Sequence, residues 1–200
     1  IFDALPVLMR VILAHRLHPA VNVRAGAMFG NMISGLKGAG EGTGSSEEAS
    51  RRCSLLVRGG ALLCCLHGLK NKAEEPMAKF ALLSSFNQMA LGAPSGFAGD
   101  PHYLETQASF DDDTQDAVKV IVTVMRNRTD PSVKGVGVSS LYHLVTTSAM
   151  ANSPAAHACA SRRQQAMAAG AAGVVRHAMR GKSGKFMQFC DTLLSKLNGQ

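Results

Sequence analysis

The chain has 200 residues, of which 46% are hydrophobic and 18% charged, and its formal net charge is +7 at pH 7. This length suits one compact domain or one short repeat array, and the composition excludes a disordered chain. Trp is absent and aromatic residues make up only 5%, so the small side chains favour close helix-on-helix packing.

The pattern of apolar residues predicts an all-α fold with almost no β structure. The predicted helices, in chain order, are residues 4–15, 21–36, 52–58, 61–70, 77–91, 117–128, 132–147, 162–169, 171–180 and 185–197. Pro19, Pro76 and Pro131 stand just before three of them, and proline suits the first turn of a helix. Asp130, which precedes Pro131, is predicted to be an N-cap.

The sequence resembles itself four times. Ala4, Ala61, Ala117 and Ala171 each open an apolar helical stretch, and they recur at intervals of 54 to 57 residues. Each stretch is followed by a turn and a second helix. The predicted units are residues 1–36, 51–91, 116–147 and 161–198, in a single repeat domain covering 1–200, with insertions at 37–50, 92–114 and 149–160. The Gly/Ser-rich segment 37–50 is predicted to be a mobile loop.

Two phrases carry a family resemblance. The segment Asp3-Ala4-Leu5-Pro6 resembles the phrase that opens the second helix of an armadillo repeat, and Arg24-Ala25-Gly26-Ala27-Met28-Phe29-Gly30-Asn31-Met32 is similar to the third armadillo helix. Gly170-Ala171 with the apolar run after it resembles the first phrase again. The resemblance implies a right-handed armadillo-like α-solenoid of about four units, with the HEAT pattern a near neighbour.

In armadillo proteins the last helices of successive units line a concave groove that binds a partner. Carried onto this sequence, the resemblance implies a ladder of polar residues at Asn31, Gln88, His143 and Lys196. The full set of candidate partner-binding residues is Arg24, Asn31, Ser84, Gln88, Ser139, His143, Thr192 and Lys196. The chain lacks the Trp that importin-type members carry one turn earlier, which argues against capture of basic peptides. Solvated helix ends are the alternative interpretation of these positions.

Cys64-Cys65-x-His67 and His157-x-Cys159 were weighed as zinc ligands. Adjacent residues on a helix point about 100° apart, so Cys64 and Cys65 cannot share one metal ion well. Buried structural cysteines are the preferred interpretation, and no metal or cofactor is predicted. The chain has five cysteines, an odd number without a disulfide framework, which indicates a reducing, intracellular compartment. A cytoplasmic, cytoskeletal or ciliary setting is expected, with an organelle left open.

No catalytic signature is present, so we expect a non-enzymatic interaction scaffold. Its concave helical surface would bind an extended peptide or a helix of a protein partner within a larger assembly, without a membrane. The sequence starts at Ile1, inside an apolar segment and without an initiator Met; a removed presequence or a segment of a longer protein would explain this start, and we favour the segment. Apolar ends near Ile1 and Leu197 favour a place within a larger assembly. The alternative is a nucleic-acid-binding helical repeat using a basic face. Its candidate residues are Arg24, Lys70, Lys72, Arg126, Arg128, Arg162, Arg163, Arg176, Arg180, Lys182 and Lys185.

Overall fold

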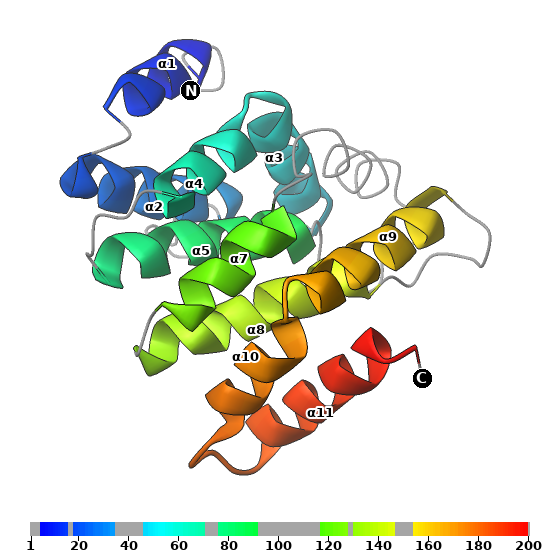
Figure 1. Ribbon diagram of the computed structural model, residues 1–200. Helices are drawn as coiled ribbons and strands as arrows, with labels where there is room; N and C mark the ends of the chain where they lie inside the picture. Colours follow the sequence, from blue (N-terminus) through cyan, green and yellow to red (C-terminus); the bar gives the residue numbers. More distant parts are fainter. Residues whose placement is uncertain are drawn as a thin grey trace.

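The computed structural model describes residues 5–15, 18–34, 46–70, 76–91, 117–127, 130–146 and 154–199. These residues form ten α-helices and no strand, which confirms the predicted all-α class (Figure 1). The helices are α1 (Leu5–Ala14), α2 (Pro19–Ser34), α3 (Ser46–Arg58), α4 (Ala61–Lys70), α5 (Pro76–Leu91), α7 (Ala117–Arg126), α8 (Pro131–Val145), α9 (Pro154–Ala168), α10 (Ala171–Met179) and α11 (Lys185–Leu197).

Local sequence chemistry explains where several helices begin. Pro19, Pro76 and Pro131 are the first residues of α2, α5 and α8, as the first-turn prediction required, because a residue there has no intrahelical use for an N–H. The predicted N-cap is also confirmed. Asp130 Oδ1 accepts hydrogen bonds from the backbone N–H groups of Ser132 at 2.7 Å and Val133 at 3.2 Å.

Two helices begin earlier than the sequence indicated. α3 starts at Ser46 instead of residue 52, and α9 at Pro154 instead of residue 162. The predicted insertions 37–50 and 149–160 were therefore too long at their C-terminal ends. The segment from Ser46 carries Glu-Glu-Ala, whose residues favour helix, and Pro154 opens a helix where it had been interpreted as a loop residue. Insertion 92–114 lies outside the described residues.

In two places a glycine in the left-handed conformation lies between one helix and the next. Gly60 (φ 87°) lies between α3 and α4, and Gly170 (φ 78°) lies between α9 and α10. Each N–H bonds the carbonyl three residues back, Val57 in the first case and Met167 in the second. Only glycine adopts this backbone without strain, so two distant parts of the sequence make the same sharp turn for the same reason.

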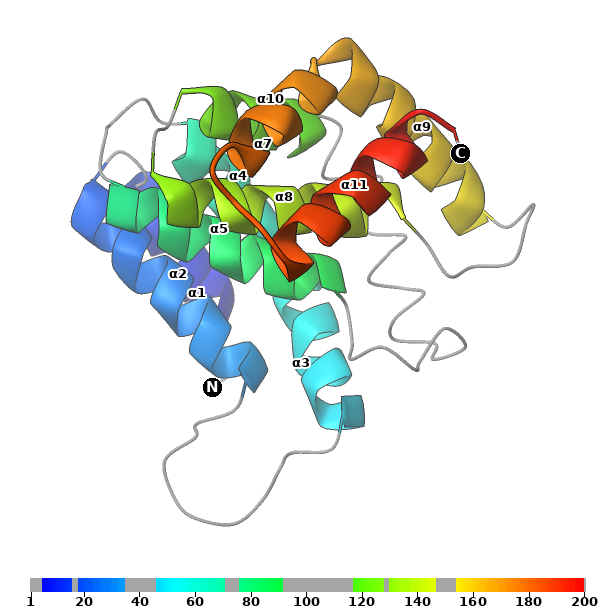
Figure 2. The same cartoon turned by 90° about the horizontal axis from the view of Figure 1, so that it is seen from below.

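The helices pack in two rows. In one row α1, α4, α7 and α10 contact one another in that order, and in the other row α2, α5, α8 and α11 do so. Figure 2 shows α5 and α8 side by side between α2 and α11. α3 packs against α2, α4 and α5, whereas α9 packs against α7, α8, α10 and α11. The second row carries all eight candidate partner-binding residues.

A continuous apolar core joins the rows. Its largest fully buried side chains include Phe29 of α2, Phe86 of α5, Met125 of α7 and Leu141 of α8. One cluster of buried residues extends from α1 to α11. Each such side chain contributes roughly 1.5–3 kcal/mol by its removal from water, and the packing of one helix against the next is therefore the main source of stability.

The two ends of the described chain differ in polarity. Leu197 is only 5% exposed, and the exposed positions of α11 are polar. The expectation of an uncapped apolar end near Leu197 is therefore wrong. On α1, in contrast, Val7 and Val11 are 55% and 50% exposed. Ile1 lies outside the described residues.

None of the described helices has by itself the length and apolar character of a membrane span. The segments Arg51–Arg58 and Ala61–Lys70 meet such a test only as a pair, and they are bent by 63°.

Candidate partner-binding surfaces

All eight candidate partner-binding residues lie at least partly in contact with solvent. Arg24 and Asn31 on α2 and Thr192 and Lys196 on α11 are exposed. The central four, Ser84 and Gln88 on α5 and Ser139 and His143 on α8, are half-buried. This is the exposure expected where side chains occupy the outward faces of packed helices, and the middle helices are more covered because each has a neighbour on both sides.

The step from α2 to α5 places the ladder residue Gln88 against Gly30. A Cβ added to Gly30, the residue before Asn31, would lie 3.5 Å from Gln88 Oε1. This oxygen is buried and has no hydrogen-bond partner among the described residues. The same is true of the neighbouring Asn87 Oδ1. A buried acceptor without a partner costs about 1–3 kcal/mol, so Gln88 is the ladder residue with the most to gain from an added donor.

The step from α8 to α11 is built on aromatic rings. The Tyr142 ring of α8 lies 4.5 Å from the Phe189 ring of α11, measured between centroids. Tyr142 also meets the His143 ring edge-on at 5.4 Å. Burial lowers the pKa of His143 from its ordinary value of 6.5, because the charged imidazolium loses its water. His143 is therefore a neutral hydrogen-bonding group at pH 7. Sequence analysis missed Tyr142 and Phe189, which position this step.

Several basic side chains donate hydrogen bonds to backbone carbonyls of the fold. Lys79 of α5 is 4% exposed, and its Nζ donates to the carbonyls of Leu69 at 2.6 Å and Gly68 at 3.2 Å, which lie at the end of α4. The last carbonyls of a helix lack intrahelical donors and carry partial negative charge. A buried cation at that point joins α4 to α5.

Three arginines of the nucleic-acid alternative serve the same purpose. Arg162 and Arg163 of α9 donate to Leu144 O at 3.4 Å and Val145 O at 2.8 Å, at the end of α8. Arg126 of α7 donates to Ala169 O at 2.6 Å, just beyond α9. Their bonds hold helix ends together. Of the other residues in that basic set, Lys72 and Arg128 lie outside the described residues.

The predicted burial of the cysteines is confirmed. All five thiols are buried and free of disulfide bonds. Cys64 and Cys65 lie in the core while His67 is exposed, so the three side chains do not face a common point. Among the described residues, no group of three or more His, Cys, Asp or Glu side chains is placed to hold a metal ion. His157 has no described side chain.

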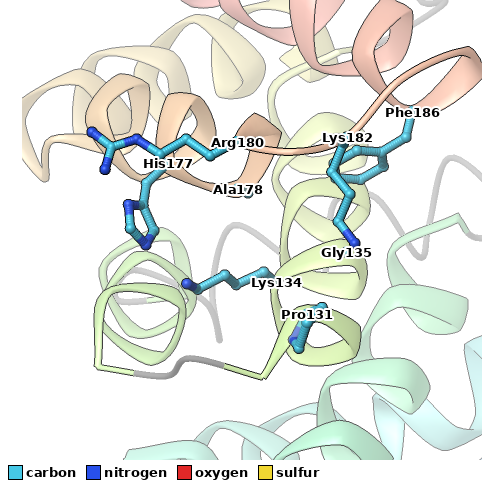
Figure 3. Close-up of a pocket in the computed structure, with 8 residues that line it drawn as sticks. All are labelled: Pro131, Lys134, Gly135, His177, Ala178, Arg180, Lys182 and Phe186. Carbon is cyan, nitrogen blue, oxygen red and sulfur yellow. The ribbon is translucent and has the colours of Figure 1, made fainter.

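A basic hollow that sequence analysis did not identify lies at the other end of α8. Its volume is about 410 Å³, and it is lined by Pro131, Lys134, Gly135, His177, Ala178, Arg180, Lys182 and Phe186 (Figure 3). The lining comes from the first turns of α8, the end of α10 and the start of α11. Sequence analysis named Arg180 and Lys182 only as members of the basic face of the nucleic-acid alternative. Their run in the sequence was the one available signal, and Lys134 carried none.

Comparison of the sequence with protein-family models and with curated proteins, and of the fold with solved structures, found no match.

Proposed function

We propose that this chain is a non-enzymatic interaction scaffold, built as a right-handed armadillo-like solenoid of four helical units. Two features support this architecture. Equivalent helices of successive predicted units contact one another in order in both rows, and the glycine turns at Gly60 and Gly170 recur at equivalent places in the second and fourth units. Each unit buries an apolar face against the next, which is how repeat arrays are stabilised.

The observation that carries the function is the position of the candidate residues. They fall on α2, α5, α8 and α11, four helices in consecutive contact, and none of the eight is buried. A partner segment lying across this row would meet a polar group on every helix. The residues one turn before the ladder include Ser84, Ser139 and Thr192, whose small size lets a partner backbone approach closely.

The ladder offers several kinds of hydrogen bond. Gln88 is half-buried and carries an amide group, and the neutral His143 imidazole both donates and accepts. Asn31 and Lys196 are exposed at the two ends of the row. A partner's backbone carries donors and acceptors alternately, so this mixture suits an extended peptide or the polar side of a helix.

The nucleic-acid alternative has weaker support. Arg126, Arg162 and Arg163 donate to backbone carbonyls of the fold, which removes them from a phosphate-binding surface. Binding to nucleic acid depends on many cations along one path. The engagement of these three side chains by the fold's own carbonyls therefore favours the scaffold. An intracellular, reducing setting fits the five free, buried thiols.

The test is quantitative affinity capture with three forms of the protein. The ladder variant carries Asn31→Ala, Gln88→Ala, His143→Ala and Lys196→Ala together. The control carries four alanines at exposed polar positions away from this row, namely Lys119, Thr123, Gln164 and Arg176. The scaffold proposal requires proteins that bind the wild type and the control but are lost from the ladder variant, with unchanged helical circular dichroism in all three.

The proposal fails if every captured protein binds the ladder variant and the wild type equally. Each lost hydrogen bond to a partner is worth about 0.5–1.5 kcal/mol, so the quadruple change should weaken a true partner by tenfold or more in dissociation constant. Capture that depends on added single-stranded nucleic acid would favour the alternative.

A further inference from the structure

The basic hollow at the start of α8 has none of the ladder residues in its lining, and in Figure 3 the Arg180 guanidinium extends past His177, away from Lys182. Figure 3 shows the His177 ring and the Lys134 side chain extending toward each other from α10 and α8. In the same view Lys182 reaches from the α10–α11 turn toward Gly135 and Pro131. Four basic side chains from three chain segments therefore border one cavity of about 410 Å³.

These basic groups differ from the basic side chains elsewhere in the fold that donate to backbone carbonyls. Lys79, Arg126, Arg162 and Arg163 all donate to helix-end carbonyls. By contrast, the side chains of Lys134, His177, Arg180 and Lys182 have no hydrogen bond or ion pair with any described residue. The ammonium groups of Lys134 and Lys182 and the guanidinium of Arg180 carry like charges, which repel one another, so an anion in the hollow would relieve this repulsion as well as form new bonds.

The carboxylate nearest along the chain is already engaged. Asp130 stands directly before the lining residue Pro131, but its Oδ1 accepts two backbone N–H bonds as the N-cap of α8. It is not among the lining residues, and none of those described is acidic. The side chains that line the hollow are therefore basic or uncharged.

The backbone holds the rim in place. Gly181 (φ 69°) and Gly184 (φ 68°) have left-handed or otherwise positive φ values between α10 and α11. The N–H of Lys182 bonds Met179 O at 3.0 Å, which closes the turn. Lys182 is thus carried on a constrained turn, and Lys134 and His177 stand on helices. The backbone positions from which these side chains extend are therefore set by the fold, without a ligand.

We infer that this hollow binds a phosphate-bearing compound of small-molecule size. The volume lies within the range of about 300–1,000 Å³ for small-molecule sites. A phosphate monoester carries about −1.5 to −2 charges and three acceptor oxygens, which suits several separate cationic donors better than a single carboxylate does. Pro131, Ala178 and Phe186 supply an apolar wall for the rest of the molecule. This inference is independent of the proposed scaffold function.

The experiment is isothermal titration calorimetry of the full chain with inorganic pyrophosphate at fixed ionic strength. The site variant is Lys134→Ala with Lys182→Ala. The matched control is Arg176→Ala with Lys185→Ala, which removes the same charge from exposed positions nearby that do not line the hollow. We expect saturable binding in the wild type and the control, and affinity at least about tenfold weaker in the site variant. Lys134→Arg, which keeps the charge, should retain binding.

Three results would overturn the inference. The first is no saturable pyrophosphate binding to the wild type. The second is an equal loss in the site variant and the control, which would show only a general effect of net charge. The third is tighter binding of a glutamate-rich peptide, or of single-stranded DNA with affinity rising with length, because either would replace a phosphate pocket by an extended acidic-partner surface.

A titration with phosphoserine separates two sources of the same chemistry. Binding of both phosphoserine and pyrophosphate supports a site able to receive a phosphorylated side chain. Binding of pyrophosphate alone supports a free phosphate compound. Helical circular dichroism of both double variants checks that each folds, and since all four substituted side chains are exposed or half-buried, no loss of helix is expected.

Discussion

Gly26 of α2 stands directly against the backbone of Ala81 of α5. A Cβ added to Gly26 would lie 2.6 Å from the Ala81 carbonyl carbon and 2.9 Å from its Cβ. The Ser85 hydroxyl also donates to Gly26 O. Because backbone atoms cannot withdraw as a flexible side chain can, this contact sets how closely two neighbouring helices of the ladder row approach each other.

Replacing Gly26 by alanine should therefore destabilise the fold. Overpacking of this kind costs about 1–3 kcal/mol, measured as the change in free energy of unfolding in urea. Gly173→Ala is the control, because Gly173 lies within α10 and a Cβ there would meet nothing within 4 Å. It should stabilise by about 0.5–1 kcal/mol, as removal of a helical glycine does. Equal effects at both sites would mean that α2 and α5 are not in this contact.

Lys79→Met tests the buried cation between α5 and α4. Methionine keeps much of the apolar stem but leaves the carbonyls of Gly68 and Leu69 without the donor that reaches them. Hydrogen bonds from charged groups contribute about 1.5–3 kcal/mol, so unfolding should become easier by about that amount. The exposed Lys119→Met on α7 should change stability by less than about 0.5 kcal/mol. If Lys79→Met left the free energy of unfolding unchanged, this would contradict a structural role for the ammonium group.

The buried thiols should make stability fall at alkaline pH. Burial raises the pKa of Cys53 from its ordinary value of 9.0 to about 12, and that of Cys64 and Cys190 to about 11. Above pH 9 the unfolded chain releases thiol protons that the folded chain still holds, so the unfolded state gains stability. The stability of the folded state is therefore not reduced by thiol ionisation below pH 9, and it falls as the pH rises toward 11–12.

Urea midpoints measured at pH 7, 9 and 10.5 should show this decline. Cys53→Ala should decline less steeply over the same pH range than the wild type, even if it is less stable at pH 7. In the folded protein at pH 8, thiol reagents should react slowly at every described cysteine, and rapidly after denaturation. Parallel pH profiles for the wild type and Cys53→Ala would rule out the thiol as the source.

Val7 and Val11 should promote self-association. They lie four residues apart on α1, on one face of the helix, and are about half exposed. Val7→Thr with Val11→Thr preserves shape while adding hydroxyls, and it should shift sedimentation equilibrium toward monomer. Met167→Gln on α9, where an isolated Met is 43% exposed, is the control and should have no such effect. A wild-type chain that is already monomeric at high concentration would end this interpretation.

The sequence by itself determined the helices and several of their boundaries. Apolar spacing, the three prolines and the Asp130 cap act within a few residues of where they stand. The ten helices of the described residues, and the starts of α2, α5 and α8 to within two residues, could therefore be predicted without knowing the fold. The burial of Cys64 and Cys65 followed from their place in an apolar helix. The starts of α3 and α9 were predicted too late. Helix-forming residues that follow glycines or surround a proline are compatible with either a helix or a loop, so local sequence does not place these two boundaries.

Only the tertiary structure decided what the charged residues do. Arg126, Arg162 and Arg163 look like surface charges in the sequence, yet each reaches a carbonyl 18 or more positions away along the chain. Lys134 had no distinguishing neighbour in the sequence, yet it lines the same hollow as His177 and Lys182, which α10 and the turn after it bring to the start of α8. A basic side chain can bond to a helix-end carbonyl only if that helix end lies within its reach. Which helix ends lie within reach is set by helix packing, through contacts between residues distant in the sequence.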